Sequence, residues 1–454
     1  MSTSTGTYQE SSDETTDGTI EPCNDQHRPN GDTFYMVSES SLLLLFVSCF
    51  YCGKSAVIKK VVFGSFLRIV QTCRHCRKKR VWDSQPYVCN IPLGNILMSA
   101  AILYSGAFPS KALHIFKILN VAAITRRTFF RHQSKYLQPA IDNVWKQNQK
   151  SLLMSLKKKG KPLVLAGDGR SDSPGHSAKY GSYSVLELNC NKIVDFKLVQ
   201  SNEVASSNHM EKEGLIRVLE FLKKKGIKVG TLVTDRHQQI AKFIREQNPD
   251  IKHYFDIWHV VKGLRKKLKA LAKTKDCELV GKWEQSITNH MYWCVASTPD
   301  CKGDVMVAKW LSLDNHIHNK HSGHGQLFRK CSHRRLVGRK RNKKWFKRHT
   351  KASEKLSPLL TNPRVCKDVA KLSPMYQTSS LEAFHSVVIH FAPKSTAFSY
   401  QGMHCRLQVA ALHFNENANR KQAVTKRGEE RYDIVFPKYK KGGYIVRKVV
   451  ENPT

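Results

Sequence analysis

The spacing of apolar and polar positions changes several times along this chain and divides it into segments. The first 33 residues are polar, acidic and rich in serine and threonine, which is typical of a disordered tail and unlike a secretory signal. Ala56 to Val70 is rich in β-branched residues and is interrupted at Gly64, which predicts a β-hairpin. Residues 91–150 follow helical spacing, and Lys146 to Lys161 is expected to be a linker.

Strand-like and helix-like segments alternate from Lys161 onward. We expect helices at 210–225 and 238–247, and strands at 161–167, 182–188, 192–199, 229–234 and 253–257. This order predicts a mixed α/β sheet of RNase H type. The following residues are helical and basic without repeated strand signals, so we expect an inserted helical domain before the last helix of the core.

Four of the 13 cysteines form two Cys-x-x-Cys pairs near the N-terminus, at Cys49, Cys52, Cys73 and Cys76. Four thiolates satisfy the tetrahedral coordination of a structural Zn²⁺, and two such pairs at this interval are typical of a zinc ribbon. The odd number of cysteines in a large chain also favours reduced thiols over disulfides. A structural zinc site is therefore predicted.

The predicted fold class is α/β, with an RNase H-like catalytic core interrupted by an inserted α-helical domain and preceded by a zinc ribbon and a helical, helix-turn-helix-like segment. The expected boundaries are a disordered acidic tail at 1–33, the zinc ribbon at 34–90, the helical region at 91–150, the first part of the core at 161–260, the inserted basic domain at 261–375, the last core helix at 376–420 and a basic tail at 421–454.

The formal net charge is +39, from 75 Lys and Arg against 36 Asp and Glu. An enzyme that acts on small neutral substrates has no use for such a field, whereas a protein that binds the phosphate backbone does. The apolar run Leu42 to Phe50 is too short to span a bilayer, and we expect no membrane association. Basic clusters at Lys157 to Lys161 and Arg334 to Arg348 suit nuclear import or backbone contacts, so nucleic acid in the nucleus is the expected partner.

Two segments are candidates for DNA contacts. Thr125 can cap a helix that carries Arg126, Arg127 and Arg131, so the region resembles a helix-turn-helix; an ordinary helical hairpin with a solvated basic face fits equally well. The second segment alternates basic and aromatic residues, which suits backbone contacts with base stacking; a solvated loop is the alternative. Its candidate residues are Lys344, Trp345, Lys347 and Arg348.

Three acidic residues are the candidates for catalysis. Asp168 and Asp235 each close an apolar strand-like run, and Glu382 lies in a run with helical spacing. Two carboxylates at strand ends and a third on a later helix can hold two divalent metals about 4 Å apart, the geometry for in-line attack on a phosphodiester. Hard oxygen ligands favour Mg²⁺ or Mn²⁺. Either aspartate alone suits a turn equally well, so the joint pattern and the surrounding charge carry the interpretation.

Three further patterns leave alternatives open. Asp256-Ile257-Trp258-His259 suits a core tryptophan beside a hydrogen-bonded histidine. Glu382-x-x-His385 also has the form of a di-iron helix motif, which is disfavoured because the other acids fall at strand ends. A second zinc site in the insertion competes with surface histidines that need no metal. Its candidate ligands are Cys294, His316, His321, Cys331 and His333.

Five segments of this chain resemble the DDE transposases of the Kolobok superfamily. They are Gly167 to Gly181, Thr234 to His237, Phe255 to Val260, Leu381 to Ser386 and Phe398 to Met403, and the resemblance extends from about residue 40 to about residue 420. Several proteins of that family carry an additional N-terminal zinc module, such as a THAP domain, and none is legible here. End recognition would then depend on the ribbon and the helix-turn-helix candidate.

The resemblance implies a cut-and-paste DNA transposase whose RNase H-like core carries the triad Asp168, Asp235 and Glu382. It also implies that Asp256 and His259 form a D-x-x-H signature beside the active site, and that TTAA is the target. Double-stranded transposon ends are the expected partner, bound by a homodimer or higher oligomer because two ends call for two active sites. The alternative is a domesticated DNA-binding protein that no longer cuts; a host ribonuclease is disfavoured by the ribbon and the long insertion.

Overall fold

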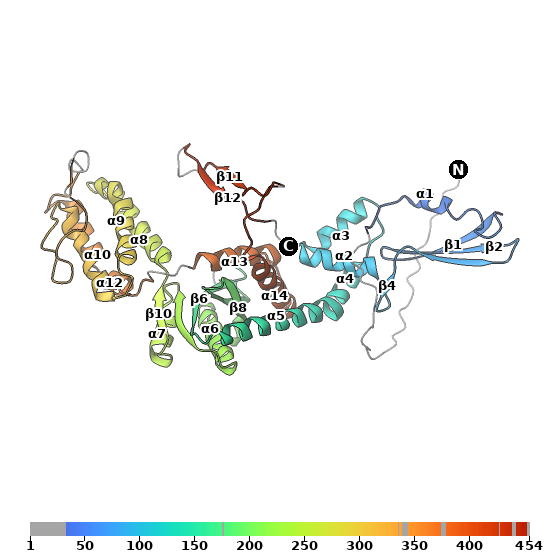
Figure 1. Ribbon diagram of the computed structural model, residues 1–454, viewed down its shortest axis with the longest axis horizontal. Helices are drawn as coiled ribbons and strands as arrows, with labels where there is room; N and C mark the ends of the chain where they lie inside the picture. Colours follow the sequence, from blue (N-terminus) through green and yellow to red (C-terminus); the bar gives the residue numbers. More distant parts are fainter. Residues whose placement is uncertain are drawn as a thin grey trace. The chain divides into compact units, whose positions relative to one another are not determined.

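The computed structural model describes residues 33–174, 177–334, 336–337, 344–373, 378–425, 427–437 and 442–451. The chain divides into two units: one contains the residues up to Ala101 and Pro109–Phe130, and the other contains Ile102–Phe108 and the chain from Arg131 onward. Figure 1 colours the elements along the sequence. The predicted tail at 1–33 lies outside the described residues except for Thr33.

The first unit contains a three-stranded antiparallel sheet in the order β1-β2-β3. Its strands are β1 (Ala56–Phe63), β2 (Phe66–Cys73) and β3 (Lys79–Asp83). The predicted hairpin is confirmed: Phe63 pairs with Phe66, and Gly64 takes a φ of +61° in the turn between them. The remaining short elements are α1 (Glu39–Leu44), β4 (Tyr87–Val88) and β5 (Ile91–Pro92).

Helices follow the small sheet, as expected. They are α2 (Leu93–Tyr104), α3 (Pro109–Ile118) and α4 (Arg126–His132). Thr125 caps α4 as predicted, because its hydroxyl oxygen accepts a hydrogen bond of 3.1 Å from the amide of Thr128. However, α4 continues through a π-helical turn, η1 (Gln133–Leu137), into the long helix α5 (Gln138–Lys158).

The expected linker at Lys146–Lys161 is wrong, because most of it belongs to α5. The buried residues of α5 are Ile141, Trp145, Leu153 and Leu156. Their spacing keeps one face of the helix apolar over its whole length, while the lysines and glutamines between them mask the periodicity. The helix therefore extends almost to the first strand of the next sheet.

The second unit contains a five-stranded mixed sheet in the order β10-β9-β6-β7-β8. The strands are β6 (Leu163–Ser171), β7 (Tyr180–Glu187), β8 (Lys192–Gln200), β9 (Val229–Thr234) and β10 (Lys252–Phe255). β6, β7 and β8 form an antiparallel meander, and β9 and β10 add in parallel on the other side of β6. The mixed α/β sheet predicted from the alternating pattern is confirmed.

Two strand ends differ from the prediction. β6 does not end at Gly167, because the chain continues to pair with β7 until Ser171 meets Gly181. Asp168 therefore lies within β6 and not at its end. β10 ends at Phe255, since Asp256 caps the helix that follows.

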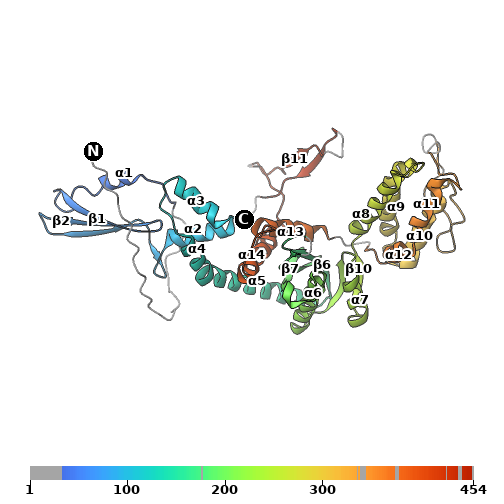
Figure 2. The same ribbon diagram turned by 180° about the vertical axis from the view of Figure 1, so that it is seen from behind.

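Helices pack on this sheet. They are α6 (Ser207–Lys224), α7 (Gln238–Gln247), α13 (Ser379–Phe391) and α14 (Tyr400–Asn417), with a 3₁₀ turn at Ser201–Glu203. α6 packs on β7 and β8 over a core that includes Leu165, Val185 and Leu215. α13 contacts β6 and β7, and α14 packs against α5 and β8. Figure 2 shows α13 and α14 together beside the strands of the sheet.

The chain between β10 and α13 is helical. Its helices are α8 (Ile257–Ala272), α9 (Glu278–Ala296), α10 (Gly303–Ile317), α11 (Lys351–Leu360) and α12 (Pro363–Val369). They enclose a hydrophobic core of their own around Trp283 and Trp310. Figures 1 and 2 both show α8, α9, α10 and α12 gathered in one bundle.

Within the segment described from its sequence only as a basic tail, β11 (Tyr432–Val435) and β12 (Ile445–Lys448) form an antiparallel hairpin. The hairpin is exposed on nearly all of its residues, which explains why its sequence carries little periodicity. Within the described residues, no helix combines the length and apolar character needed to cross a bilayer.

Candidate active site and metal centre

The sheet brings Asp168 and Asp235 side by side. β6 and β9 are parallel neighbours, and Gly167 pairs with Thr234. The next residue on each strand is one of the two aspartates, and adjacent strands lie only about 4.8 Å apart. Burial, and then the charge of Asp168, raise the pKa of Asp235 above its usual range. The two carboxylates therefore repel each other at one edge of the sheet.

Helix α13 brings the third acid to the same edge. His385 Nδ1 lies 3.4 Å from Asp168 Oδ2, and Glu382 precedes His385 by one helical turn. Glu382 Oε1 lies 3.9 Å from His259 Nε2, and its side chain is 44% exposed. The three acids thus face one region that is open to solvent.

The triad is an open arrangement. Among the described residues, groups of three or more ligand atoms within 4.8 Å of one another occur only at a cysteine cluster and at a histidine and cysteine cluster. Oxygen ligands that are separated and partly exposed leave positions for water or a phosphate oxygen around a divalent ion. Asp168, Asp235 and Glu382 do not form a closed group of this kind.

Asp256 and His259 form a pair next to the triad. Asp256 is 2% exposed, caps α8, and its Oδ2 lies 3.1 Å from His259 Nδ1. This hydrogen bond is the main reason that the pKa of His259 is raised, with further contributions from the charges of Asp256, Asp235 and Asp168. Because Asp256 holds Nδ1, the other ring nitrogen faces Glu382.

The tryptophan between them was expected in the core, and this expectation is wrong. The side chain of Trp258 is 43% exposed, and Lys262 Nζ lies 4.5 Å from its ring centroid. Trp258 is the second residue of α8, and the buried residues of that helix fall at other positions, among them Ile257 and Val261. Its face is therefore presented to solvent near the acids.

Glu211 on α6 is a fourth acid at this edge, and sequence reasoning missed it. Burial raises its pKa to about 7, with further contributions from Asp235 and Asp168. His237 Nε2, from the turn after β9, lies 3.7 Å from Glu211 Oε2. A side chain on Gly169 would meet Glu211 at 2.3 Å, so glycine is required where α6 approaches β6.

The sequence contains one signal for Glu211, which is Gly214, a glycine in the interior of the same helix about one turn later. Gly214 lies against Tyr183, where an added side chain would meet Cβ of Tyr183 at 2.4 Å. A cavity of about 360 Å³ opens beside Gly169 and Glu211. It is lined by Gly169, Arg170, Ser173, Glu211, His385 and Lys394, so both acids and cations face it.

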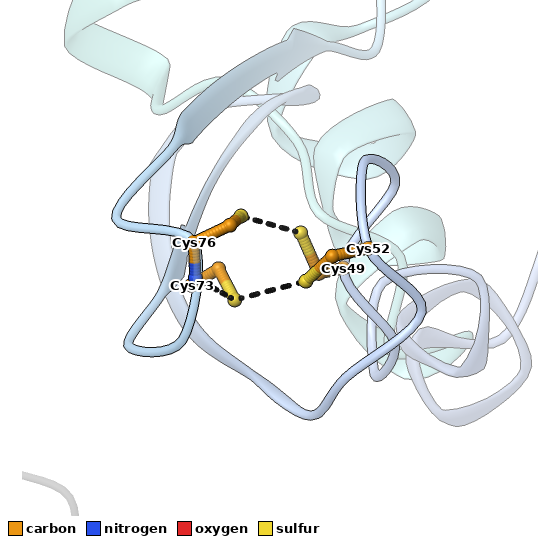
Figure 3. A group of neighbouring side chains, drawn as sticks. All are labelled: Cys49, Cys52, Cys73 and Cys76. Carbon is orange, nitrogen blue, oxygen red and sulfur yellow. Dashed lines mark hydrogen bonds between the residues drawn. The ribbon is translucent and has the colours of Figure 1, made fainter.

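The four N-terminal cysteines form a second candidate site. Cys49 Sγ lies 3.6 Å from Cys76 Sγ, and Cys52 Sγ lies 3.6 Å from Cys73 Sγ. Figure 3 shows the two pairs pointing toward one another from two separate turns. Tetrahedral zinc with Zn–S bonds of about 2.3 Å requires sulfur atoms about 3.8 Å apart, close to these distances. The cluster could hold a structural metal such as zinc.

Backbone amides prepare the thiolates for a metal. The amide of Tyr51 donates to Cys49 Sγ and is the main reason that the pKa of Cys49 is lowered. The amide of Cys76 donates to Cys73 Sγ and, with that of His75, lowers the pKa of Cys73 to about 6. Each pair is followed by a residue with positive φ, Gly53 at +68° and Arg77 at +57°, which turns the amides toward sulfur.

The predicted zinc ligands of the inserted segment are brought together only in part. His316, His321, Cys331 and His333 form a group whose ligand atoms lie within 4.8 Å of one another. Cys294 is excluded from this group, so the prediction that it is a ligand is wrong. It is fully buried in the core of α8–α12, where burial raises the pKa of its thiol.

The candidate DNA contacts are mostly exposed. Arg126, Arg127 and Arg131 lie on exposed positions of α4, and Lys344, Lys347 and Arg348 are exposed as well. Trp345 differs, because its ring packs against Trp283 at 5.4 Å between centroids, and Phe346 is 3% exposed. Phe346 is therefore not accessible for stacking on a base, whereas Trp345 is only partly buried, and its contact with DNA stays a prediction. Residues 335 and 338–343 of this basic segment lie outside the described residues.

The chain matches no known family model, and no curated protein matches it. The chemistry of the site is therefore argued from its own residues. These residues are three carboxylates from separate elements, a fourth, partly buried acid at Glu211 and the nearby cations Arg170 and Lys394.

Proposed function

We propose that this protein is a DDE-type DNA transposase, which cleaves and joins DNA strands with two divalent metals held by Asp168, Asp235 and Glu382. The observation that carries the proposal is that Asp168 and Asp235 directly follow Gly167 and Thr234, which pair on the parallel strands β6 and β9, with His385 of α13 beside Asp168. The three acids come from elements far apart in the sequence, and a turn or a surface cluster needs no such convergence.

The strand order of the sheet supports an RNase H-like core. An antiparallel meander β6-β7-β8, joined on its first strand to the parallel strands β9 and β10, is the arrangement that the resemblance to Kolobok transposases implies. The helices α8–α12 fall between β10 and α13 and enclose their own core, which supports an inserted domain.

The residues take distinct roles in this proposal. Asp168, Asp235 and Glu382 would together hold the Mg²⁺ or Mn²⁺ ions, because hard carboxylate oxygens suit these metals. When bound, the metals activate the attacking oxygen and stabilise the leaving oxygen. Asp256 orients His259 toward Glu382 and fixes that carboxylate, acting as a positioning residue.

Double-stranded DNA is the proposed substrate. The formal charge of +39 attracts a polyanion, and the mixed lining of the cavity beside Glu211 suits a phosphate held near metal. Transposon ends and TTAA targets, a nuclear location and a homodimer or higher oligomer belong to the same proposal.

Cleavage assays with matched substitutions test this function. DNA bound by the purified protein is first selected from a randomised duplex pool, and nicking and strand joining on that DNA are then measured with Mg²⁺, Mn²⁺ or EDTA. We expect Asp168→Asn, Asp235→Asn and Glu382→Gln each to lower activity by at least about three orders of magnitude with DNA affinity retained. Asp250→Asn and Glu246→Gln change exposed acids of the same type elsewhere and should leave activity unchanged.

The outcomes separate the alternatives. Full activity in any triad variant removes that residue from the site. Salt-dependent binding of selected DNA without metal-dependent cleavage identifies a domesticated DNA-binding protein. The logarithm of affinity should fall against the logarithm of salt by roughly 0.9 for each phosphate that is neutralised, and a flat response contradicts any nucleic-acid function.

A further inference from the structure

The segment that joins α10 to α11 contains three histidines and a cysteine in one group. His316 lies in the last turn of α10, and His321, Cys331 and His333 follow it in the chain. The described residues between Ile317 and Lys351 include no helix and no named strand. Connections of this length in a compact region are uncommon unless something constrains them.

The spacing of the ligand atoms fits a tetrahedral zinc site. Bonds of about 2.0–2.1 Å to nitrogen and about 2.3 Å to sulfur give nitrogen–nitrogen edges of about 3.3 Å and nitrogen–sulfur edges of about 3.6 Å. Cys331 Sγ lies 3.5 Å from His316 Nδ1 and 3.7 Å from His321 Nδ1. His321 Nδ1 lies 3.3 Å from His333 Nε2. All three distances match the edges of one tetrahedron.

The hydrogen bonds of the outer ring nitrogens fix which nitrogen faces the centre. His321 Nε2 lies 2.9 Å from the carbonyl oxygen of the Asn319 side chain, which only accepts, so Nε2 carries the proton. His333 Nδ1 likewise donates to the backbone carbonyl of Arg334 at 2.8 Å. The inner nitrogens of the two rings, His321 Nδ1 and His333 Nε2, therefore face each other, as two nitrogen ligands of one cation do.

We propose that His316 Nδ1, His321 Nδ1, Cys331 Sγ and His333 Nε2 bind a structural Zn²⁺ that fastens this segment to the end of α10. Three imidazole nitrogens and one thiolate suit zinc and not magnesium. Four protein ligands close the coordination sphere, so the ion has a structural role. The site is independent of the carboxylate triad and of the proposed transposase activity.

His324 is a neighbour of the site and not a ligand. Its Nε2 lies 3.2 Å from Cys331 Sγ, but it does not belong to the group of mutually close ligand atoms. Its ring stacks on Phe328 at 5.9 Å with an interplanar angle of 8°. From this position it donates a hydrogen bond to the thiolate and limits the negative charge on sulfur.

The ion would also fix the neighbouring basic residues. The ring centroid of Trp345 lies 5.6 Å from that of His316 and 5.5 Å from that of His321. The amide of Phe346 donates to the carbonyl of Ile317 at 3.0 Å, and Trp283 Nε1 donates to the carbonyl of Lys344 at 2.9 Å. The metal-binding histidines thus form one wall of the pocket that anchors Trp345, between the exposed Lys344 and Lys347.

Metal content of the full-length protein tests the proposal. Cys331→Ser should lower the bound zinc by one ion per chain, whereas Cys301→Ser, at a partly exposed cysteine of the same bundle outside the group, should leave it unchanged. With Co²⁺ in place of zinc, the difference spectrum between wild type and Cys331→Ser should contain a charge-transfer band of a single thiolate. Hydrogen exchange of residues 318–350 should rise in Cys331→Ser while that of β6 and β9 is unchanged.

Two histidine variants test the proposal even if Cys331→Ser fails to fold. His333 is exposed, so His333→Ala should fold and lose the zinc ion during dialysis against a mild chelator. His324→Ala should keep it. Equal zinc content in wild type, Cys331→Ser and His333→Ala overturns the proposal, and loss of zinc in His324→Ala but not in His333→Ala refutes the ligand set.

Discussion

The cysteine cluster and the carboxylate triad are two candidate metal sites built in opposite ways. The cysteines come from two turns that flank one hairpin, and their thiolates are held by backbone amides. The acids come from β6, from the residue after β9 and from the distant helix α13. Burial, and then the charge of Asp168, raise the pKa of Asp235. The cysteine cluster could enclose an ion with four protein ligands, whereas the three acids do not form a closed group of this kind.

This difference determines what loss of a ligand does to each site. An ion with four protein ligands contributes its binding free energy to folding, so the loss of one ligand destabilises the fold. Acids that repel one another in the absence of metal cost folding free energy, so the loss of one stabilises the protein and removes activity. Opposite signs of the change in stability are therefore the signature that separates a structural site from a catalytic one.

The largest effect is expected at the cysteine cluster. Cys73→Ser should release one zinc ion per chain and abolish hydrogen-exchange protection in β1, β2 and β3, because structural zinc contributes roughly 10–16 kcal/mol of apparent binding free energy. Cys89→Ser, an exposed cysteine outside the cluster, is the matched control. Unchanged protection of this sheet in Cys73→Ser or in strong chelator would show that the cluster binds no structural metal.

Asp256→Asn should weaken the active site without removing a carboxylate of the triad. The protonated form of His259 attracts Glu382, and Asp256 stabilises that form by raising the pKa of His259. Metal-dependent activity should rise with pH as His259 loses its proton. Asp256→Asn should move this rise to lower pH, because it removes the contact that raises the pKa of His259. We also expect at least a tenfold loss in the apparent affinity for Mg²⁺. A pH profile identical to that of wild type contradicts this coupling.

Asp235→Asn should stabilise the metal-free protein. The pKa of Asp235 is higher in the folded state than in the unfolded state, so ionisation of Asp235 lowers the free energy of unfolding. This cost is present at neutral pH and disappears in acid. The substitution should raise the free energy of unfolding in EDTA by up to about 2 kcal/mol and abolish any stabilisation by Mg²⁺. Thermal melts with EDTA and with Mg²⁺ measure both effects. A destabilised Asp235→Asn that still responds to Mg²⁺ would reverse the contrast between the two sites.

The sequence was sufficient where the determinants are local. The Cys-x-x-Cys spacing, the turn at Gly64, the cap at Thr125 and the apolar runs of the strands all specify structure through near neighbours. Asp168 and Asp235 were predicted as a pair because each follows an apolar strand-like run in the sequence. The sequence could not show that β6 continues beyond Asp168, because that extension depends on pairing with β7.

Other features depend on contacts between distant segments. Cys294 is a cysteine, as the candidate ligand Cys331 is, but the packing of α9 directs it into the core. Trp345 lies among basic residues, yet its ring packs against Trp283. Glu211 carries no motif of its own, and its position follows from the glycines that let α6 approach the sheet. Tertiary packing decides each of these cases, and residue type and spacing alone do not.

The smallest predicted effect belongs to Glu211, the acid that sequence reasoning missed. Its pKa is about 7 in the folded protein against an ordinary value of 4.5, so the folded state binds the proton more tightly than the unfolded state does. Stability of the metal-free protein should therefore fall as pH rises from 4.5 to about 7, by about 1 kcal/mol once solvent screening of a side chain that is 31% exposed is allowed for.

Glu211→Gln should remove this component of the pH dependence, whereas Glu213→Gln, two positions along α6, should preserve it. Thermal melts in EDTA between pH 4.5 and pH 8 measure the slope. Mg²⁺ should reduce the slope of the wild type in part, because burial is the main cause of the raised pKa of Glu211 and a cation at the neighbouring aspartates offsets only the additional repulsion. If neither Mg²⁺ nor the substitution changes the slope, Glu211 is not part of the proposed metal-binding site, which would then contain only the other three acids.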